Sequence, residues 1–114
     1  MSITFEEYQS QAVTTAIYPE KGTGSKLALA YVALGAGNEG GEVQGKIKKY
    51  LRGDFELTEE KRLAILDEVG DTIWYLAGVA EELGSTLDEA AQRNLDKLLD
   101  RKERGVLKGD GDSR

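Results

Sequence analysis

The sequence has 114 residues, with 21 acidic and 15 basic side chains, one proline, no cysteine and no histidine. This length suits a single domain with one core, and the acidic balance argues against a general nucleic-acid-binding surface. The absence of cysteine and histidine excludes disulfides, thiolate or imidazole metal ligands, and cysteine- or histidine-dependent nucleophiles. An enzyme of this composition would have to work with carboxylates, amines, guanidinium groups and hydroxyls.

The chain carries no pattern typical of export or membrane insertion. Its first residues, MSITFEEYQ, contain acids where a signal peptide has a basic head and an apolar run. No stretch approaches the roughly 18 apolar residues of a membrane span. We therefore expect a cytoplasmic protein with no membrane partner and no nucleic-acid partner.

The first half of the chain predicts two helices. Thr4 and Glu7 have the spacing of a capping box, so a first helix should run to about residue 17. The stretch YPEKGTGSK breaks the chain, and a second helix should follow over about residues 25–51.

The second half predicts two more helices. Thr58 is a candidate cap for a third helix, whose apolar residues recur every three or four positions until Gly84. Thr86 with Glu89 forms another capping box, and Gly105 should end this fourth helix. Since no segment alternates like a strand, we predict an all-α bundle of about four helices. We expect residues 1–114 to form a single domain, with a flexible segment over 106–114.

The expected third helix contains two acids without a nearby cation. Glu68 and Asp71 are three positions apart in LAILDEVGDTIWYLAGVA, whose charges are all negative. No basic residue lies three or four helical positions from either acid, and an otherwise apolar helix is usually buried on most sides. Because buried unpaired carboxylates are destabilising, the pattern predicts a cation from outside the sequence.

The expected second helix contains a matching pair, Glu39 and Glu42. Two such pairs on facing helices would converge as oxygen donors, which suit Mg²⁺ or Mn²⁺ and leave room for phosphate oxygens. Glycines at 40, 41 and 45 would let the backbone come close to another helix or to a ligand. The alternative is a solvated face on which these acids pair with Lys46 and Lys49.

Basic and polar side chains share one face of the fourth helix. Asn94, Lys97, Arg101 and Arg104 recur at intervals of three and four, and such a face can neutralise phosphate oxygens. The alternative is a solvated helix end that complements the helix dipole. Trp74 could stack on a nucleobase or belong to the core.

In order and spacing, these motifs resemble the MazG-like family of all-α nucleoside triphosphate pyrophosphohydrolases. The family pattern of E-x-x-E, a spacer and E-x-x-D reads here as EGGE at 39–42 and EVGD at 68–71. The resemblance covers roughly residues 25–114. It implies hydrolysis of (d)NTP to (d)NMP and pyrophosphate by water attack at the α-phosphorus. The residues that it implies bind Mg²⁺, or Mn²⁺ as a substitute, and carry catalysis are Glu39, Glu42, Glu68 and Asp71.

The resemblance also implies substrate contacts and self-association. Family members are usually dimers or dimers of dimers, so we expect a homodimer or homotetramer. The family's base pockets vary in the first helix and the following loop, where the resemblance fades. The residues expected to contact the nucleotide are Asn94, Lys97, Arg101, Lys46, Lys49, Trp74 and Lys108.

Two other functions stay open on the sequence alone. A non-catalytic helical adaptor of the same fold would bind nucleotide or a protein partner without turnover. A plain metal-stabilised bundle would gain thermal stability from Mg²⁺ and nothing from triphosphates. The intact set of four carboxylates favours the enzyme, because a pure adaptor has no reason to hold four uncompensated acids.

Overall fold

A computed structural model describes residues 2–114, which form four α-helices, one short 3-10 helix and no strand. The predicted all-α fold with four helices is therefore confirmed. None of the described helices is both long and apolar enough to cross a membrane. The elements in chain order are α1 (Phe5–Ala12), η1 (Val13–Thr15), α2 (Lys26–Arg52), α3 (Glu59–Glu82) and α4 (Leu87–Glu103).

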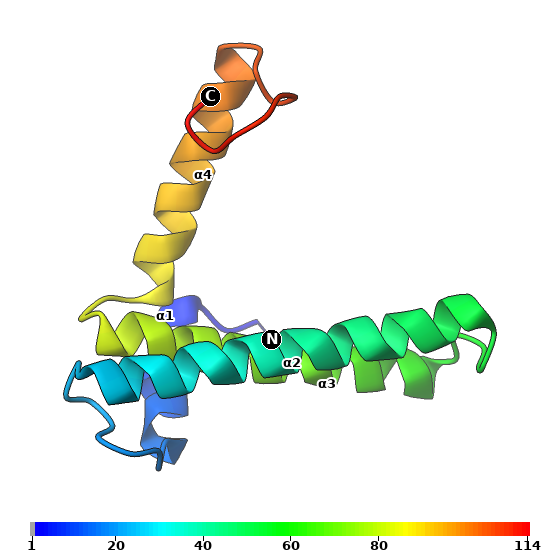
Figure 1. The fold of residues 1–114 in the computed structure, drawn as a ribbon, viewed down its shortest axis with the longest axis horizontal. Coiled ribbons are helices and arrows are strands. Elements are labelled where there is room, and N and C mark those ends of the chain that lie inside the picture. Colours follow the sequence, from blue (N-terminus) through cyan, green and yellow to red (C-terminus); the bar gives the residue numbers. More distant parts are fainter. Residues whose placement is uncertain (1) are drawn as a thin grey trace.

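The helices α2 and α3 lie side by side as a long hairpin, and α4 projects from one end of it (Figure 1). The helix α4 contacts α1 and α3 and, among the described residues, makes no contact with α2. The residues of α2 and those of α4 therefore lie in separate parts of the folded chain.

The predicted caps start the helices. The hydroxyls of Thr4, Thr58 and Thr86 each accept a hydrogen bond from the backbone three residues ahead, at 3.1, 3.2 and 3.1 Å. Such bonds satisfy amide groups that have no partner within the first helical turn. Gly84 and Gly105 take positive φ values of 69° and 73° at the ends of α3 and α4, as a helix stop requires.

The first helix is shorter than predicted. It ends at Ala12 and continues only as the 3-10 turn of η1. The hydroxyls of Thr14 and Thr15 donate to the backbone carbonyls of Gln11 and Ala12 at 2.6 and 2.7 Å. Short β-branched hydroxyl residues compete for backbone groups in this way, which weakens a regular helix.

Two glycines set the spacing of the hairpin. A Cβ on Gly78 would lie 2.7 Å from the side chain of fully buried Val32, and a Cβ on Gly35 would lie 2.2 Å from the ring of Tyr75. The helices α2 and α3 can therefore approach closely only because both positions lack a side chain. This close packing places the facing side chains of the two helices at a fixed separation.

Within the single chain, Gly40, Gly41 and Gly45 do not make the predicted approach to a neighbouring helix, and their approach to a ligand stays a prediction. A Cβ at any of these positions would meet no atom within 4 Å. The close approach occurs instead one turn and more toward the start of α2, because the small and buried residues of the hairpin are concentrated there.

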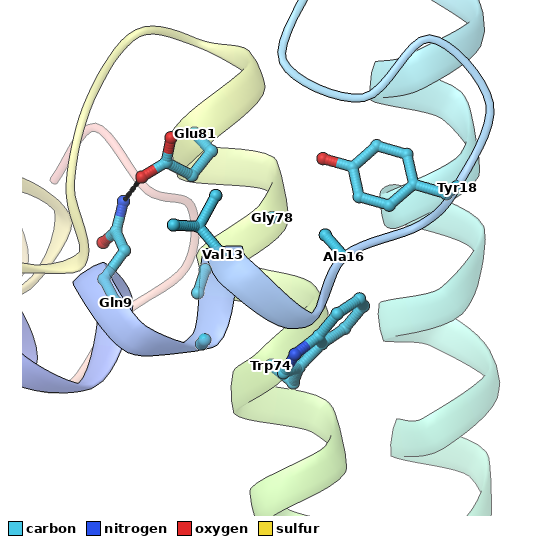
Figure 2. A pocket seen from close by; sticks show the side chains of 9 residues that line it. Gln9, Val13, Ala16, Tyr18, Trp74, Gly78 and Glu81 are labelled. Carbon is cyan, nitrogen blue, oxygen red and sulfur yellow. Dashed lines mark hydrogen bonds between the residues drawn. The ribbon is translucent and has the colours of Figure 1, made fainter.

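The segment before α2 is packed across the hairpin and holds α4 at its base. Figure 2 shows Val13, Ala16 and Trp74 gathered where η1 crosses α3, leaving a cavity of only about 10 Å³. Buried Gln9 donates to Glu81 Oε1 at 2.8 Å and accepts from the amide of Leu87, the first residue of α4, at 2.7 Å. Gln9 therefore joins α1 to the corner between α3 and α4.

The expectation that α3 is buried on most sides is also wrong for the single chain. Packing against α2 covers one face, whereas the opposite face keeps large apolar side chains in solvent. The most prominent exposed apolar residues of α3, of its C-cap and of α4 are Leu63, Leu66, Leu76, Leu83, Leu95, Leu98 and Leu99.

Candidate metal centre

The hairpin brings three predicted carboxylates together. Glu39 of α2 and Glu68 and Asp71 of α3 each place an oxygen so that all three atoms lie within 4.8 Å of one another. The pair on α3 shares one helical face because its members are three positions apart. Glu39 and Glu68 are half-buried and Asp71 is exposed, so the group opens to solvent on one side.

The charges in this group repel one another. Partial burial, followed by the charges of Asp71 and Glu68 and a hydrogen bond with Glu68, raises the pKa of Glu39 above its ordinary value. The nearest basic group is Lys46, whose Nζ lies 3.9 Å from Glu68 Oε1. One long ion pair leaves most of the negative charge uncompensated. A set of hard oxygen donors with excess negative charge fits a divalent cation such as Mg²⁺.

Glu42, the fourth predicted carboxylate, lies outside this group. It is exposed on α2, one turn beyond Glu39, and its charge contributes to the raised pKa of Glu39. Glu42 is therefore near the three grouped carboxylates, but it is not one of the acids whose oxygen atoms lie within 4.8 Å of one another.

The two lysines of α2 have different surroundings. Lys46 lies at the edge of the carboxylate group, as its contact with Glu68 shows. Lys49 lies closer to the end of the helix, where its charge adds to the hydrogen bond from Arg52 in lowering the pKa of Asp54. Both predicted alternatives, ion pairing and phosphate contact, remain compatible with the position of Lys46.

Aromatic side chains border the carboxylates. Glu39, Asp71, Trp74 and Tyr75 line an open groove of about 360 Å³. The indole of Trp74 packs edge-on against Tyr75, with ring centres 5.0 Å apart. Tyr75 follows Asp71 by four positions, which places both side chains on one helical face. This spacing is the sequence signal that predicts Tyr75 at the groove.

Trp74 also forms a wall of a second groove. This groove measures about 420 Å³ and is lined further by Tyr8, Gln11 and Thr14 of the α1–η1 segment. The Trp74 indole donates to Thr15 Oγ1 at 2.9 Å, which fixes the ring between the two grooves. Burial, followed by the charge of Asp71, raises the pKa of Tyr8. No local signal predicts Tyr8, because only the fold brings α1 beside α3.

The predicted substrate residues of α4 lie apart from the carboxylates. Asn94 and Lys97 line a groove of about 900 Å³ between α3 and α4, which contains none of the three grouped acids. The carboxylate groove, in turn, contains no residue of α4. Arg101 is buried, and Lys108 is exposed in the segment that follows α4.

Comparison with known proteins identifies the family. Residues 30–106 match the MazG nucleotide pyrophosphohydrolase domain, a span that includes the predicted carboxylates and the α4 residues. The chain is also 45% identical over 109 residues to the Gene 37 protein of Mycobacterium phage L5, covering 94% of this chain and 96% of that protein. No solved structure matches significantly. The chain therefore belongs to the MazG nucleotide pyrophosphohydrolase family, whose members act on nucleoside triphosphates and generally depend on divalent metal ions.

Proposed function

We propose that this protein is a Mg²⁺-dependent pyrophosphohydrolase that converts (d)NTP and water to (d)NMP and pyrophosphate. The observation that carries the proposal is the convergence of Glu39, Glu68 and Asp71 within 4.8 Å, from two helices inside the matched domain. In this reaction a water oxygen bonds to the α-phosphorus, and the bond from that phosphorus to the bridging oxygen of the β-phosphate breaks. The cytoplasm, where nucleoside triphosphates occur, is the proposed compartment.

The three grouped carboxylates are the proposed metal ligands, with Glu42 as a further ligand one turn away. Their mutual repulsion, visible in the raised pKa of Glu39, is relieved by a bound cation. Held by these carboxylates, Mg²⁺ or Mn²⁺ would supply positive charge to the triphosphate and favour ionisation of a water. A carboxylate oxygen of these residues that does not contact the metal would orient the water toward the α-phosphorus.

Lys46 is the proposed phosphate contact on α2. Its amine already lies at the edge of the site, 3.9 Å from Glu68, and its side chain is 37% exposed. A loose, partly solvated ion pair contributes little to stability, so the amine can turn to a phosphate oxygen at small cost. Lys49, one turn further, is a second and more distant candidate.

The aromatic residues provide the proposed place for the base. Trp74 separates the carboxylate groove from the groove lined by Tyr8, so a nucleotide with its phosphates on the acids can lay its base on the indole. Stacking of a base on an aromatic ring contributes about 1–3 kcal/mol and tolerates different bases. Gln11 and Thr14 line the same groove and offer polar groups for base selection.

A second copy of the chain is the proposed source of the α4 contacts. Within one chain, Asn94 and Lys97 share no groove with the carboxylates. The exposed leucines of α3 and α4 form an apolar surface that a partner chain would cover. A homodimer or homotetramer would then bring the α4 of one chain to the acids of another.

Product analysis tests the proposal. Purified protein is incubated with Mg²⁺ and each common NTP and dNTP, and products are separated by anion exchange. Monophosphate plus pyrophosphate, lost in Glu68→Gln and kept in Asp67→Asn, is the expected result. Asp67 is the matched control because it is an exposed acid of the same helix outside the grouped carboxylates. Diphosphate plus orthophosphate would contradict the point of attack, and the absence of turnover would favour a nucleotide-binding adaptor.

A further inference from the structure

The segment after α4 places a carboxylate on the predicted phosphate-binding cations. The chain turns after the end of α4 and folds back beside this helix (Figure 1). Lys97 Nζ lies 3.1 Å from Asp112 Oδ1 and 3.3 Å from Oδ2. Arg101 Nη2 lies 2.9 Å from Asp112 Oδ1 and also donates to the backbone carbonyl of Asp112. Both cations are therefore held by one residue of the chain itself.

The backbone of this segment is organised to hold that carboxylate in place. Gly105 and Gly111 take φ values of 73° and 85°, which a residue with a side chain rarely adopts. The guanidinium of Arg114 donates to the carbonyls of Val106, Leu107 and Gly111 at 3.2, 3.0 and 2.6 Å. The segment is thus a closed loop with internal hydrogen bonds.

The contact occupies a cation that substrate would need. The side chain of Arg101 is only 7% exposed, whereas that of Asp112 is 81% exposed. Hydrogen bonds from Arg101 and Lys97, followed by the charges of these residues, lower the pKa of Asp112, so this carboxylate is ionised at neutral pH. Two negative oxygens on an arginine and a lysine reproduce the contacts that a phosphate group would make.

We propose that Asp112 is a built-in competitor for the anion site formed by Lys97 and Arg101, and that polyphosphate binds there only by displacing residues 106–114. This inference rests on the proposed function, which assigns these two cations to the triphosphate. Because both Lys97 and Asp112 are exposed, their ion pair is weak enough to be exchanged, and the incoming phosphate oxygens replace the carboxylate at buried Arg101. A polyphosphate carries several negative charges and so replaces one carboxylate favourably. The contact raises the ligand concentration that is needed and leaves the chemical step unchanged.

Binding of inorganic tripolyphosphate tests the inference without requiring hydrolysis of a nucleotide. Its affinity for the full chain is measured by isothermal titration calorimetry for the unsubstituted protein, Asp112→Asn and Asp110→Asn. Asp110 is the matched control because it lies in the same segment and, in the described structure, has no ion-pair partner. Loss of the competing carboxylate should tighten binding about three- to tenfold in Asp112→Asn, as expected for two ion pairs that share one largely exposed carboxylate, and Asp110→Asn should match the unsubstituted protein.

Amide relaxation by NMR supplies a second readout. Saturating tripolyphosphate should make the amides of Gly109 and Gly111 mobile in the unsubstituted protein, and in Asp112→Asn they should be mobile without ligand. Equal or weaker binding by Asp112→Asn, no binding by either protein, or a segment that stays ordered at saturation would each overturn the inference. If nucleotides are hydrolysed but Asp112→Asn binds tripolyphosphate with unchanged affinity, this inference is refuted and the proposed reaction is not. Tighter Asp112→Asn binding without turnover of any nucleotide would refute the proposed reaction alone.

Discussion

Tyr18 and Glu82 lie 64 positions apart in the chain, and the Tyr18 phenol donates a hydrogen bond to Glu82 Oε2 within the folded core. The same carboxylate accepts from the amides of Gly22 and Gly24 at 2.8 and 2.9 Å. One buried acid at the end of α3 thus fixes the whole loop that leads into α2. Although burial alone would raise the pKa of Glu82, these hydrogen bonds outweigh burial and lower it.

Replacement of Glu82 should destabilise the fold. Glu82→Gln removes the charge and turns an amide group toward backbone donors, so the free energy of unfolding should fall by about 2–4 kcal/mol. Tyr18→Phe removes only one donor and should cost about 1–2 kcal/mol. Urea unfolding followed by circular dichroism measures both. Equal losses in the two variants would contradict the central role of the carboxylate.

The stability contributed by Glu82 should depend on pH. Its folded pKa is lowered, so its contribution is present above the ordinary glutamate value of about 4.3 and is lost as the pH falls through the lowered value. The unfolding free energy of the unsubstituted protein should therefore fall more steeply below about pH 4.3 than that of Glu82→Gln. Parallel curves for the two proteins would refute the link.

In metal-free protein, the contribution of Glu39 to stability should change with pH in the opposite direction. Partial burial and the charges of Asp71 and Glu68 raise the pKa of Glu39, so stability falls as the pH rises from the ordinary glutamate value through the raised one. Glu39→Gln should therefore raise the melting temperature at neutral pH in the presence of a chelator. Addition of Mg²⁺ should raise the melting temperature of the unsubstituted protein and of Asp67→Asn, but not that of Glu39→Gln.

Two glycine substitutions in α2 should have opposite effects. Gly40→Ala adds a Cβ in open space and improves helix propensity, so the unfolding free energy should rise by about 0.5–1 kcal/mol. Gly35→Ala places a Cβ 2.2 Å from the Tyr75 ring and should lower the unfolding free energy by about 1–3 kcal/mol. Thermal and urea unfolding of both variants measures the difference. A destabilised Gly40→Ala would mean that this helix packs against something outside the single chain.

Fluorescence of Trp74, the single tryptophan of the chain, should report on the base. If the base lies on the indole, nucleoside triphosphate with Mg²⁺ should quench the emission, whereas tripolyphosphate should leave it nearly unchanged. Trp74→Phe should weaken nucleotide affinity by about 1 kcal/mol or more and leave tripolyphosphate affinity unaltered. Quenching by tripolyphosphate alone would point to a change near the carboxylates instead.

Mixed variants should reveal a site shared between chains. Glu68→Gln and Lys97→Met should each be inactive alone, because one lacks a metal ligand and the other a phosphate contact. In a dimer with shared sites, an equal mixture after subunit exchange should recover about a quarter of full activity, since half of the dimers then have one intact site. No recovery after confirmed exchange would place both residues in a site within one chain.

Local interactions let the sequence by itself determine most of the secondary structure. The caps at Thr4, Thr58 and Thr86 and the stops at Gly84 and Gly105 depend on hydrogen bonds and backbone angles within a few residues. The three-residue spacing of Glu68 and Asp71 likewise places them on one helical face wherever the helix lies. Both acid pairs could therefore be singled out from spacing, and the Glu68–Asp71 pair also from the absence of neighbouring cations.

Which residues of different helices come into contact depends on the tertiary structure. Gly35 and Gly78, rather than the predicted Gly40, let α2 approach α3, and this packing sets Glu39 beside Glu68 while leaving Glu42 outside the group. The tertiary structure also brings Tyr8 close to Asp71 and Asp112 into contact with Arg101, although these residues belong to different elements. It likewise keeps α4 apart from the grouped acids. No local pattern encodes such contacts, because they depend on how side chains of separate helices fill the space between them.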